Sequence, residues 1–252
     1  MDRTLLITGG SRGIGAATAL RAAREGWDVI VNFHRDAAAA QAVVAQVQAL
    51  GRRAMAVLAD VANEAQVMAM FGQVDAAVQA GWAPLRGLVN NAGIVDVAAR
   101  VDAMSAQRMQ RMFAVNVLGS MLCARETVRR CSSAHGGAGG AIVNLSSAAA
   151  RLGSPGQYVD YAAAKGAIDA FTIGLAKEVA AEGIRVNAVR PGLIETEIHA
   201  SGGLPTRVRD LQHLVPMQRG GTADEVAQAI VWLLSDAASY TTMSLMDVSG
   251  GR

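Results

Sequence analysis

Short apolar runs rich in β-branched residues alternate with longer helical stretches along almost the whole chain. We predict seven strands, at residues 5–8, 28–33, 54–59, 87–90, 141–146, 185–190 and 244–248. Helices are predicted between them, at residues 14–25, 36–50, 63–80, 105–130, 158–182 and 223–235. Strands joined by such helices become parallel neighbours in one sheet, with helices on both of its faces. The pattern therefore predicts an α/β fold of Rossmann type, with a doubly wound, seven-stranded parallel sheet.

The βα pattern runs from residue 4 to residue 248 without a break in composition. With 52% hydrophobic and 17% charged residues, the chain is typical of a packed globular protein, not of a disordered one. The glycine-rich stretch 132–140 is predicted to be a surface loop, because it lies between a helix and a strand. We therefore predict a single domain over residues 1–252. Asn63 with Gln66, and Thr222 with Glu225, fit reciprocal capping of two helices.

Charge and cysteine content exclude several classes of partner. The 23 basic and 21 acidic side chains give a net charge of +2, which is no electrostatic signal for nucleic acid or an anionic membrane. Cys123 and Cys131 form no Cys-x-x-Cys motif, so neither a disulfide framework nor a metal site is predicted. No apolar run approaches the roughly 20 residues of a membrane span, and the first residues leave no room for a signal peptide. We expect a cytoplasmic protein.

A glycine-rich turn, TGGSRGIG at residues 8–15, connects the first predicted strand to the first predicted helix. Such a turn lets backbone N–H groups at a helix N-terminus approach a phosphate. A nucleotide-hydrolysing P-loop needs Lys and Ser or Thr after the last glycine, but Ala16 and Ala17 stand there. Dinucleotide binding is therefore predicted. The signal is weak by itself, because glycines at such a turn can also serve tight packing alone.

Further short motifs follow in order along the chain. They are NNAG at residues 90–93, Asn116 in Asn-Val-x-Gly, Ser147 after the fifth strand, Tyr161 with Lys165, and Pro191-Gly192 with Thr196 after the sixth strand. With the Thr-Gly-x-x-x-Gly-x-Gly turn, they resemble the short-chain dehydrogenase/reductase superfamily, in particular its 3-oxoacyl-[acyl-carrier-protein] reductase-like and glucose-dehydrogenase-like members. The resemblance covers nearly the whole chain and implies an enzyme that uses a nicotinamide cofactor.

The resemblance also implies where that cofactor binds. The glycine turn would hold the pyrophosphate, residues 60–61 the adenine, and residues 191–196 the nicotinamide amide, with a substrate lid over residues 193–217. The implied contacts are Gly9, Ser11, Arg12, Gly13, Ile14, Gly15, Asp60, Val61, Asn91, Ala92, Gly93, Tyr161, Lys165, Pro191, Gly192, Ile194 and Thr196.

Carbonyl reduction requires a proton donor as well as a hydride. Tyr161 can supply the proton, but a tyrosine has a pKa near 10 and needs a nearby positive charge to lower it. Lys165, four residues later on the same helix face, is expected to supply that charge. Ser147 is expected to hold the substrate oxygen, and Asn116 resembles the family residue that keeps a water in a proton relay.

Two neighbouring hydroxyls compete with these candidates. Tyr158 is a rival phenol, but Ala162 stands where an activating lysine would be, so we expect Tyr158 to line the pocket. Ser146 competes with Ser147, which the resemblance favours as second in the Ser-Ser pair. The four histidines are expected to be solvated or to pack in the lid, with His199 in the lid segment kept as a minor candidate.

The end of the second strand favours NADP over NAD. An NAD enzyme places an acidic residue there, but this chain reads Asn32-Phe33-His34-Arg35. The following Asp36 is expected to cap the next helix. Arg35, Arg12 in the glycine turn, and Asn32 are the predicted neighbours of the adenosine ribose, with both arginines on its 2′-phosphate. The alternative is that both arginines are solvated and that either cofactor is accepted.

Substrate and partners are less constrained, because one fold serves many activities. We expect a small-molecule carbonyl or alcohol. Arg129 and Arg130 could contact an acyl carrier protein, although cations at a helix C-terminus also interact with its dipole. The resemblance implies a homotetramer, with helices 105–130 and 158–182 at the interface.

An alternative function is a catalytically silent dinucleotide-binding sensor or scaffold, which is expected to lack some of the four catalytic candidates. All four are present. Met243 departs from the family pattern, which often has glycine there. We expect Met243 to have a negative φ or to lie in a shifted loop.

Overall fold

The computed structural model describes residues 3–197 and 202–252. Its centre is one sheet with the strand order β3-β2-β1-β4-β5-β6-β7, in which every neighbouring pair is parallel. The strands are β1 (Arg3–Ile7), β2 (Trp27–Phe33), β3 (Ala54–Leu58), β4 (Leu85–Asn90), β5 (Gly140–Leu145), β6 (Ile184–Pro191) and β7 (Leu245–Val248). The predicted single-domain, seven-stranded α/β fold is confirmed. The strand order reverses between β1 and β4, which opens a crevice at their carboxyl ends.

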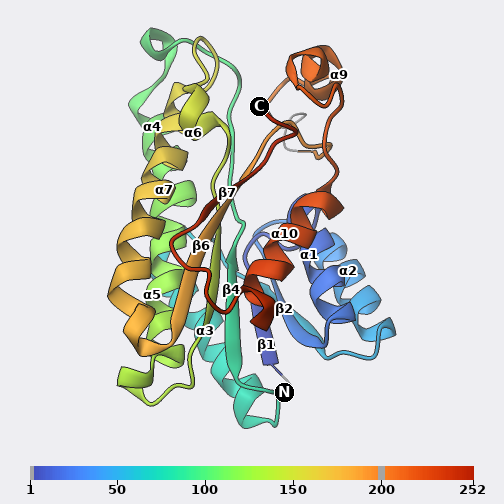
Figure 1. Cartoon of the computed structure of the whole chain (residues 1–252), viewed down its shortest axis with the longest axis vertical. Helices are drawn as coiled ribbons and strands as arrows, with labels where there is room; N and C mark the ends of the chain where they lie inside the picture. Colours follow the sequence, from blue (N-terminus) through green and yellow to red (C-terminus); the bar gives the residue numbers. More distant parts are fainter. Residues whose placement is uncertain (1–2, 198–201) are drawn as a thin grey trace.

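Helices cover both faces of the sheet (Figure 1). One face carries α1 (Gly13–Arg24), α2 (Ala37–Ala49) and α10 (Ala223–Leu234), and the other carries α3 (Glu64–Gln79), α4 (Ala106–Phe113), α5 (Gly119–Cys131) and α7 (Val159–Val179). Alternate strand residues supply the two cores: Leu5 and Ile7 pack toward α1, whereas Leu6 packs toward α3 and α5. Among the described residues, no helix has the length and apolarity that crossing a bilayer requires.

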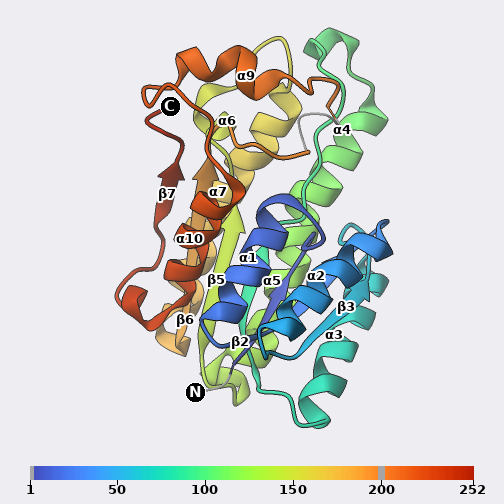
Figure 2. The same ribbon diagram turned by 90° about the vertical axis from the view of Figure 1, so that its right-hand side faces the viewer.

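Two short helices were not predicted, α6 (Ala149–Leu152) and α9 (Arg207–Leu211). Both are too short to show a helical period in the sequence. Figure 2 shows α6 and α9 near the carboxyl ends of the strands. They therefore border the crevice, where a binding site is expected in an open α/β sheet.

The long helix predicted at residues 105–130 is present as a continuous helical run, but it is not α-helical throughout. A π-helical turn, Ala114–Leu118, separates α4 from α5, with Asn116 inside it. The Asn116 side chain donates to Ile94 O at 3.1 Å and to Met112 O at 3.0 Å. Turns of this kind occur mostly as single turns inside α-helices, and they are frequent at functional sites.

The capping predictions are confirmed in part. Asp36 accepts a hydrogen bond from the Ala39 N–H at 2.9 Å, and Thr222 forms the full reciprocal pair with Glu225. Asn63 caps α3 through the Gln66 N–H, but the Gln66 side chain accepts from the Asp60 N–H at 2.8 Å instead of from Asn63. The Asn63 pair is therefore a simple cap, because the chain before α3 offers Gln66 another donor.

Met243 has a φ of +64°, so the expectation of a negative φ is wrong. Its N–H donates to Val186 O at 2.7 Å, and the Val186 N–H donates to the Thr242 hydroxyl at 3.1 Å. These bonds tie the turn before β7 to β6. The Met243 side chain is 43% exposed, so it points toward solvent and does not have to fit into a packed core.

Candidate active site

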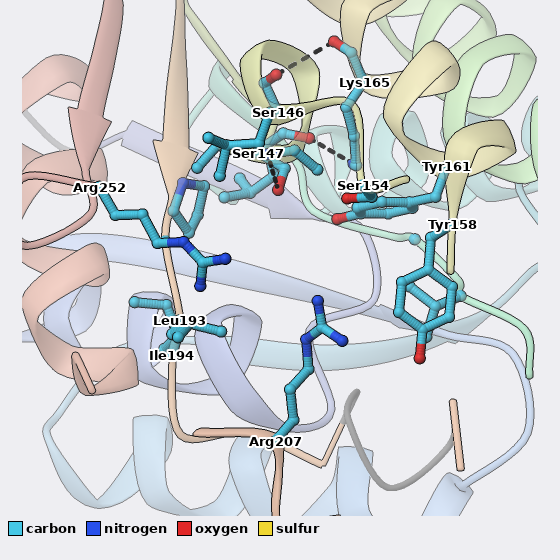
Figure 3. Close-up of a pocket in the computed structure, with 18 of the residues that line it drawn as sticks. Ser146, Ser147, Ser154, Tyr158, Tyr161, Lys165, Leu193, Ile194, Arg207 and Arg252 are labelled. Atoms are coloured by element: carbon cyan, nitrogen blue, oxygen red, sulfur yellow. Dashed lines mark hydrogen bonds between the residues drawn. The ribbon is translucent and has the colours of Figure 1, made fainter. Parts of the chain in front are cut away.

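A cavity of about 500 Å³ lies at the carboxyl ends of β4, β5 and β6 (Figure 3). Its wall includes Ser147 after β5, Tyr161 and Lys165 from α7, and residues from the segment 191–214. Several implied cofactor contacts lie in the same wall: Ile14, Asn91, Gly93, Pro191, Gly192, Ile194 and Thr196. The fold therefore brings together motifs that are far apart in the sequence.

The glycine turn is held closely against the segment after β4. A Cβ at Gly15 would lie 2.6 Å from both Asn91 Nδ2 and Gly9 O, so no larger residue fits there. The Asn91 amide donates to Thr8 O at 2.9 Å and to Gly9 O at 2.8 Å, and the Ala92 N–H donates to the Thr8 hydroxyl at 3.0 Å. Asn91 and Ala92 therefore support the shape of the turn.

The turn fits an anion. Gly9 and Gly13 have φ values of +61° and +54°, and the backbone N–H groups of residues 11–15 donate to no acceptor within the described chain. These donors lie at the N-terminus of α1, where the helix dipole favours negative charge. A Cβ at Gly13 would lie 3.4 Å from Thr196 Cγ2, which places Thr196 beside the turn.

At the end of β2, Asn32 is only 2% exposed. Its Oδ1 accepts from the Gly9 N–H at 3.2 Å, and its Nδ2 donates to Val57 O at 3.3 Å and Ala59 O at 3.1 Å. The side chain is therefore occupied in holding the glycine turn to β2 and β3. Arg12 and Arg35, by contrast, are exposed, and their guanidinium groups have no hydrogen-bond or ion-pair partner in the part of the chain that the structure describes.

Asp60 follows β3, and its Oδ2 forms an ion pair with Arg111 Nη1 at 2.9 Å. Burial of the Asp60 carboxylate opposes its ionisation, but hydrogen bonds from Arg111 and from the Ala62 N–H outweigh burial and lower its pKa. Val61 is buried against Gly119, where an added Cβ would lie 2.7 Å from Val61 Cγ2. The Asp60-Val61 segment is therefore firmly held beside the π-helical turn.

Tyr161 and Ser147 form a hydroxyl pair within the cavity wall. Tyr161 comes from the first turn of α7, and its phenol lies in the same cavity wall as the Ser147 hydroxyl. Burial raises the pKa of Tyr161 to about 12, with the nearby Ser147 hydroxyl acting in the opposite direction. A phenol with this pKa is protonated at neutral pH and can therefore donate a proton.

Lys165 lies beside the Tyr161 ring, and its role in activating the phenol stays a prediction. The Lys165 ammonium donates to Leu145 O at 2.6 Å and lies 5.5 Å from the centroid of the Tyr161 ring. Burial lowers the pKa of Lys165 to about 8, with the charge of Asp169 opposing this shift. The carbonyl of Leu145 attracts the ammonium, and the desolvated phenol stays neutral.

Asn116 lies behind the cavity wall. Its Oδ1 accepts from the Ile94 N–H at 3.2 Å. A Cβ at Gly93 would lie 2.8 Å from this oxygen and 3.7 Å from Lys165 Nζ, so Gly93 passes closely between the two side chains. Asn116 therefore holds the loop after β4 in position beside Lys165.

The two rival hydroxyls are engaged with the backbone. Ser146 donates to Lys165 O at 3.2 Å, and Tyr158 donates to Gly202 O at 3.2 Å. Both residues line the cavity, as expected for Tyr158. The Ser147 hydroxyl accepts from the Ala149 N–H at 3.1 Å, which still leaves its own proton to donate. The Tyr161 and Ser147 hydroxyls are therefore the pair in this wall that can donate to a substrate.

Sequence reasoning missed several polar residues of the cavity, chiefly Arg207, Arg252 and Gln157. No motif marks them, although Arg207 lies within the segment predicted as a lid. His199 lies outside the described residues.

The acyl-carrier candidates Arg129 and Arg130 form ion pairs with the protein itself. Arg129 pairs with Glu126 at 2.8 Å, and Arg130 pairs with Asp75 at 2.7 Å. Both guanidinium groups therefore already have a carboxylate partner within the chain.

Comparison with known proteins agrees with the geometry. Residues 9–252 match the protein family described as enoyl-(acyl carrier protein) reductase. An uncharacterized oxidoreductase of Escherichia coli, YgfF, is 56% identical over 247 residues, which cover 98% of each chain. A 3-oxoacyl-[acyl-carrier-protein] reductase of Synechocystis is 37% identical over 98% of this chain and 95% of its own. The crystal structure of a short chain dehydrogenase from Burkholderia cenocepacia in complex with NADP superposes with a TM-score of 0.87 at 34% identity, covering 99% of this chain and 97% of that one. The chain therefore belongs to the short-chain dehydrogenase/reductase superfamily of oxidoreductases.

Proposed function

We propose that the protein is an NADP(H)-dependent oxidoreductase that interconverts a carbonyl compound and a secondary alcohol, with Tyr161 as general acid and base. The observation that carries this proposal is the Tyr161–Ser147 hydroxyl pair in the wall of a cavity of about 500 Å³. The NADP complex of the Burkholderia relative supports the choice of cofactor.

When bound, the cofactor supplies or accepts the hydride. The N–H groups of residues 11–15 hold its pyrophosphate, and Arg12 and Arg35 bind the 2′-phosphate. Asn32, Asn91 and Ala92 keep the glycine turn in shape for this task. The segments 60–61 and 191–196 contact the adenine and nicotinamide ends.

The chain's own residues manage the substrate oxygen. Ser147 donates a hydrogen bond that orients the carbonyl, and Tyr161 delivers a proton as charge develops on the oxygen. Lys165 carries positive charge beside this site at neutral pH, because its pKa is about 8. Asn116 acts through Gly93 by keeping the neighbouring loop in position.

We also propose that residues 193–217 cover the substrate. The described part of this segment contributes Leu193, Ile194, Thr196, Arg207, Leu211 and Leu214 to the cavity wall.

Replacing the phenol tests the proposal directly. Tyr161→Phe removes the proton donor while keeping the ring, so kcat for carbonyl reduction should fall roughly 10²- to 10⁴-fold with little change in NADPH affinity. Tyr240→Phe is the matched control, because Tyr240 is fully exposed and outside the cavity. NADPH oxidation and fluorescence titration measure the two quantities.

Retention of more than half of kcat in Tyr161→Phe would show that Tyr161 is not the acid. If NADPH binds but a broad panel of ketones, aldehydes and alcohols is not turned over, the silent-sensor alternative is favoured instead.

A further inference from the structure

Two arginines reach into the cavity from its outer side. Arg207 is the first residue of α9, Arg252 follows β7, and both are half-buried. Figure 3 shows their guanidinium groups converging on the space bordered by Ser147 and Tyr161. Because both arginines line the same cavity as the hydroxyl pair, a ligand of modest size can contact all of them.

Internal contacts hold the Arg207 side chain and the Arg252 main chain in place, and no carboxylate neutralises either guanidinium among the described residues. The Arg207 guanidinium donates to Gln157 Oε1 at 2.6 Å and lies 5.3 Å from the centroid of the Tyr158 ring. The Arg252 main-chain oxygen accepts from Arg151 at 3.1 Å, whereas the Arg252 guanidinium has no hydrogen-bond acceptor among the described residues. Each guanidinium has five N–H donors, so most of these donors lack an acceptor within the described chain.

No carboxylate side chain lines this cavity among residues 3–197 and 202–252. The four residues between these ranges, Ile-His-Ala-Ser, contain no acidic side chain either. The lining does contain a third cation, Lys165, so the described side chains of the wall carry net positive charge. Burial, and to a lesser degree the charge of Arg252, lower the pKa of Arg207, while Tyr158 acts in the opposite direction. The two like charges are thus close enough to interact.

Several other partly buried arginines of this protein have a carboxylate partner or several backbone acceptors. Arg108 pairs with Asp160, Arg130 with Asp75, and Arg190 with Asp169. Arg185, which has no carboxylate partner, donates instead to backbone carbonyls, including Leu233 O at 2.6 Å and Ser235 O at 3.1 Å. A partly buried cation without such compensation is costly, and an anionic ligand would remove that cost.

We propose that the substrate is a small carbonyl compound carrying a carboxylate, which Arg207 and Arg252 bind while the carbonyl faces Tyr161 and Ser147. The inference rests on the proposed function and deepens it. Guanidinium groups bind carboxylates in bidentate geometry, and two of them fix the substrate's orientation. The remaining wall is largely apolar, with Leu152, Leu193, Leu211 and Leu214, and suits a short aliphatic spacer between the two groups.

Matched acids and esters test this assignment. The probes are 4-oxopentanoate, 5-oxohexanoate and 6-oxoheptanoate, each paired with its uncharged methyl ester and assayed with NADPH. Loss of one charge-assisted hydrogen bond weakens binding by roughly 10-fold to 150-fold. The kcat/KM for at least one acid should therefore exceed that for its ester by this factor. Arg207→Gln and Arg252→Gln should each bring the acid-to-ester ratio down toward unity.

Arg209→Gln is the matched control. Arg209 lies on the same helix, is exposed, pairs with Asp210 at 3.4 Å and does not line the cavity. This variant should keep the wild-type acid-to-ester ratio. Circular dichroism of each variant checks folding, and Arg252→Gln tests the site without altering α9.

Equal or better use of the esters by the wild type overturns the proposal, as does an acid preference that survives in both variants. A higher kcat/KM for an uncharged 3-oxoacyl thioester than for any of the acids also overturns it. If no carbonyl compound is reduced, the proposed function fails separately. Calorimetric titration of the wild type with the acids then tests the anion site. Binding that is lost in Arg207→Gln or Arg252→Gln supports the site, and absence of binding to the wild type overturns it.

Discussion

Arg12 and Arg35 differ from most arginines of this chain because both are exposed and lack a partner among the described residues. Asn32, between them in sequence, is buried and holds Gly9, so it is not free to discriminate between ribose groups. Asp36 is likewise occupied as the cap of α2. Any preference for the 2′-phosphate therefore depends on the two guanidinium groups.

We predict that the wild type prefers NADPH over NADH by roughly 10-fold to 150-fold in kcat/KM. This factor corresponds to the free energy of one charge-assisted hydrogen bond to the 2′-phosphate. The Arg12→Ala/Arg35→Ala double variant should lose this preference. Arg24→Ala is the control, because Arg24 is exposed at the far end of α1. Steady-state kinetics with both cofactors provide the measurement. Equal use of NADH and NADPH by the wild type would contradict the assignment of both arginines.

At the scale of elements, the start of α7 is held to α4 by a buried ion pair. Arg108 donates to Asp160 through Nε at 2.8 Å and through Nη2 at 3.2 Å, and the two side chains are 10% and 2% exposed. Asp160 also accepts from the Tyr161 N–H at 2.9 Å. The pair therefore fixes the helical turn that carries the candidate catalytic phenol.

We predict that Arg108→Gln or Asp160→Asn lowers the free energy of unfolding by about 3 to 5 kcal/mol, because each leaves a buried partner uncompensated. The double variant should lose clearly less than the sum of the two single variants. Urea unfolding of the four proteins measures this coupling. Strictly additive losses would mean that the ion pair does not act as a unit. Arg100→Gln is the control, since Arg100 forms an exposed pair with Asp102.

At the scale of the whole molecule, several large apolar side chains are exposed on α3, α5 and the π-helical turn between α4 and α5. Met68 is 42% exposed, Leu118 is 47% exposed and Met121 is 42% exposed. Figure 1 shows α5 and α7 together on one side of the sheet. Large exposed apolar side chains on neighbouring elements are a feature of interaction sites between proteins.

We predict that the protein is a homotetramer that uses this α5 surface in one of its interfaces. Leu118→Glu/Met121→Glu places charges at the contact and should shift the mass toward dimer or monomer. Leu50→Glu is the control, because Leu50 is 41% exposed at the end of α2 on the opposite face of the sheet. Analytical ultracentrifugation measures the mass. A monomeric wild type would refute the assembly, and an unaffected tetramer in the double variant would refute the surface.

Local sequence patterns determined much of this protein. Each strand is a short apolar run and each long helix has its own period, so the seven strands and the parallel sheet could be predicted from neighbouring residues. The Asp36 and Thr222 caps are equally local, since they depend on residues three positions apart. Membership of the superfamily also followed from short motifs, because each is contiguous in the chain.

The tertiary structure alone decided features that join distant residues. The Lys165 ammonium turns to Leu145 O, and burial keeps the Tyr161 phenol neutral, although the spacing of the two residues suggested direct activation. Met243 takes a left-handed conformation because β6 supplies hydrogen bonds to its turn. Arg207 and Arg252 meet Tyr161 in one cavity only when α9 and the chain after β7 pack over the sheet. Burial, hydrogen-bond choice and charge proximity are properties of packed neighbours, and sequence spacing does not specify those neighbours.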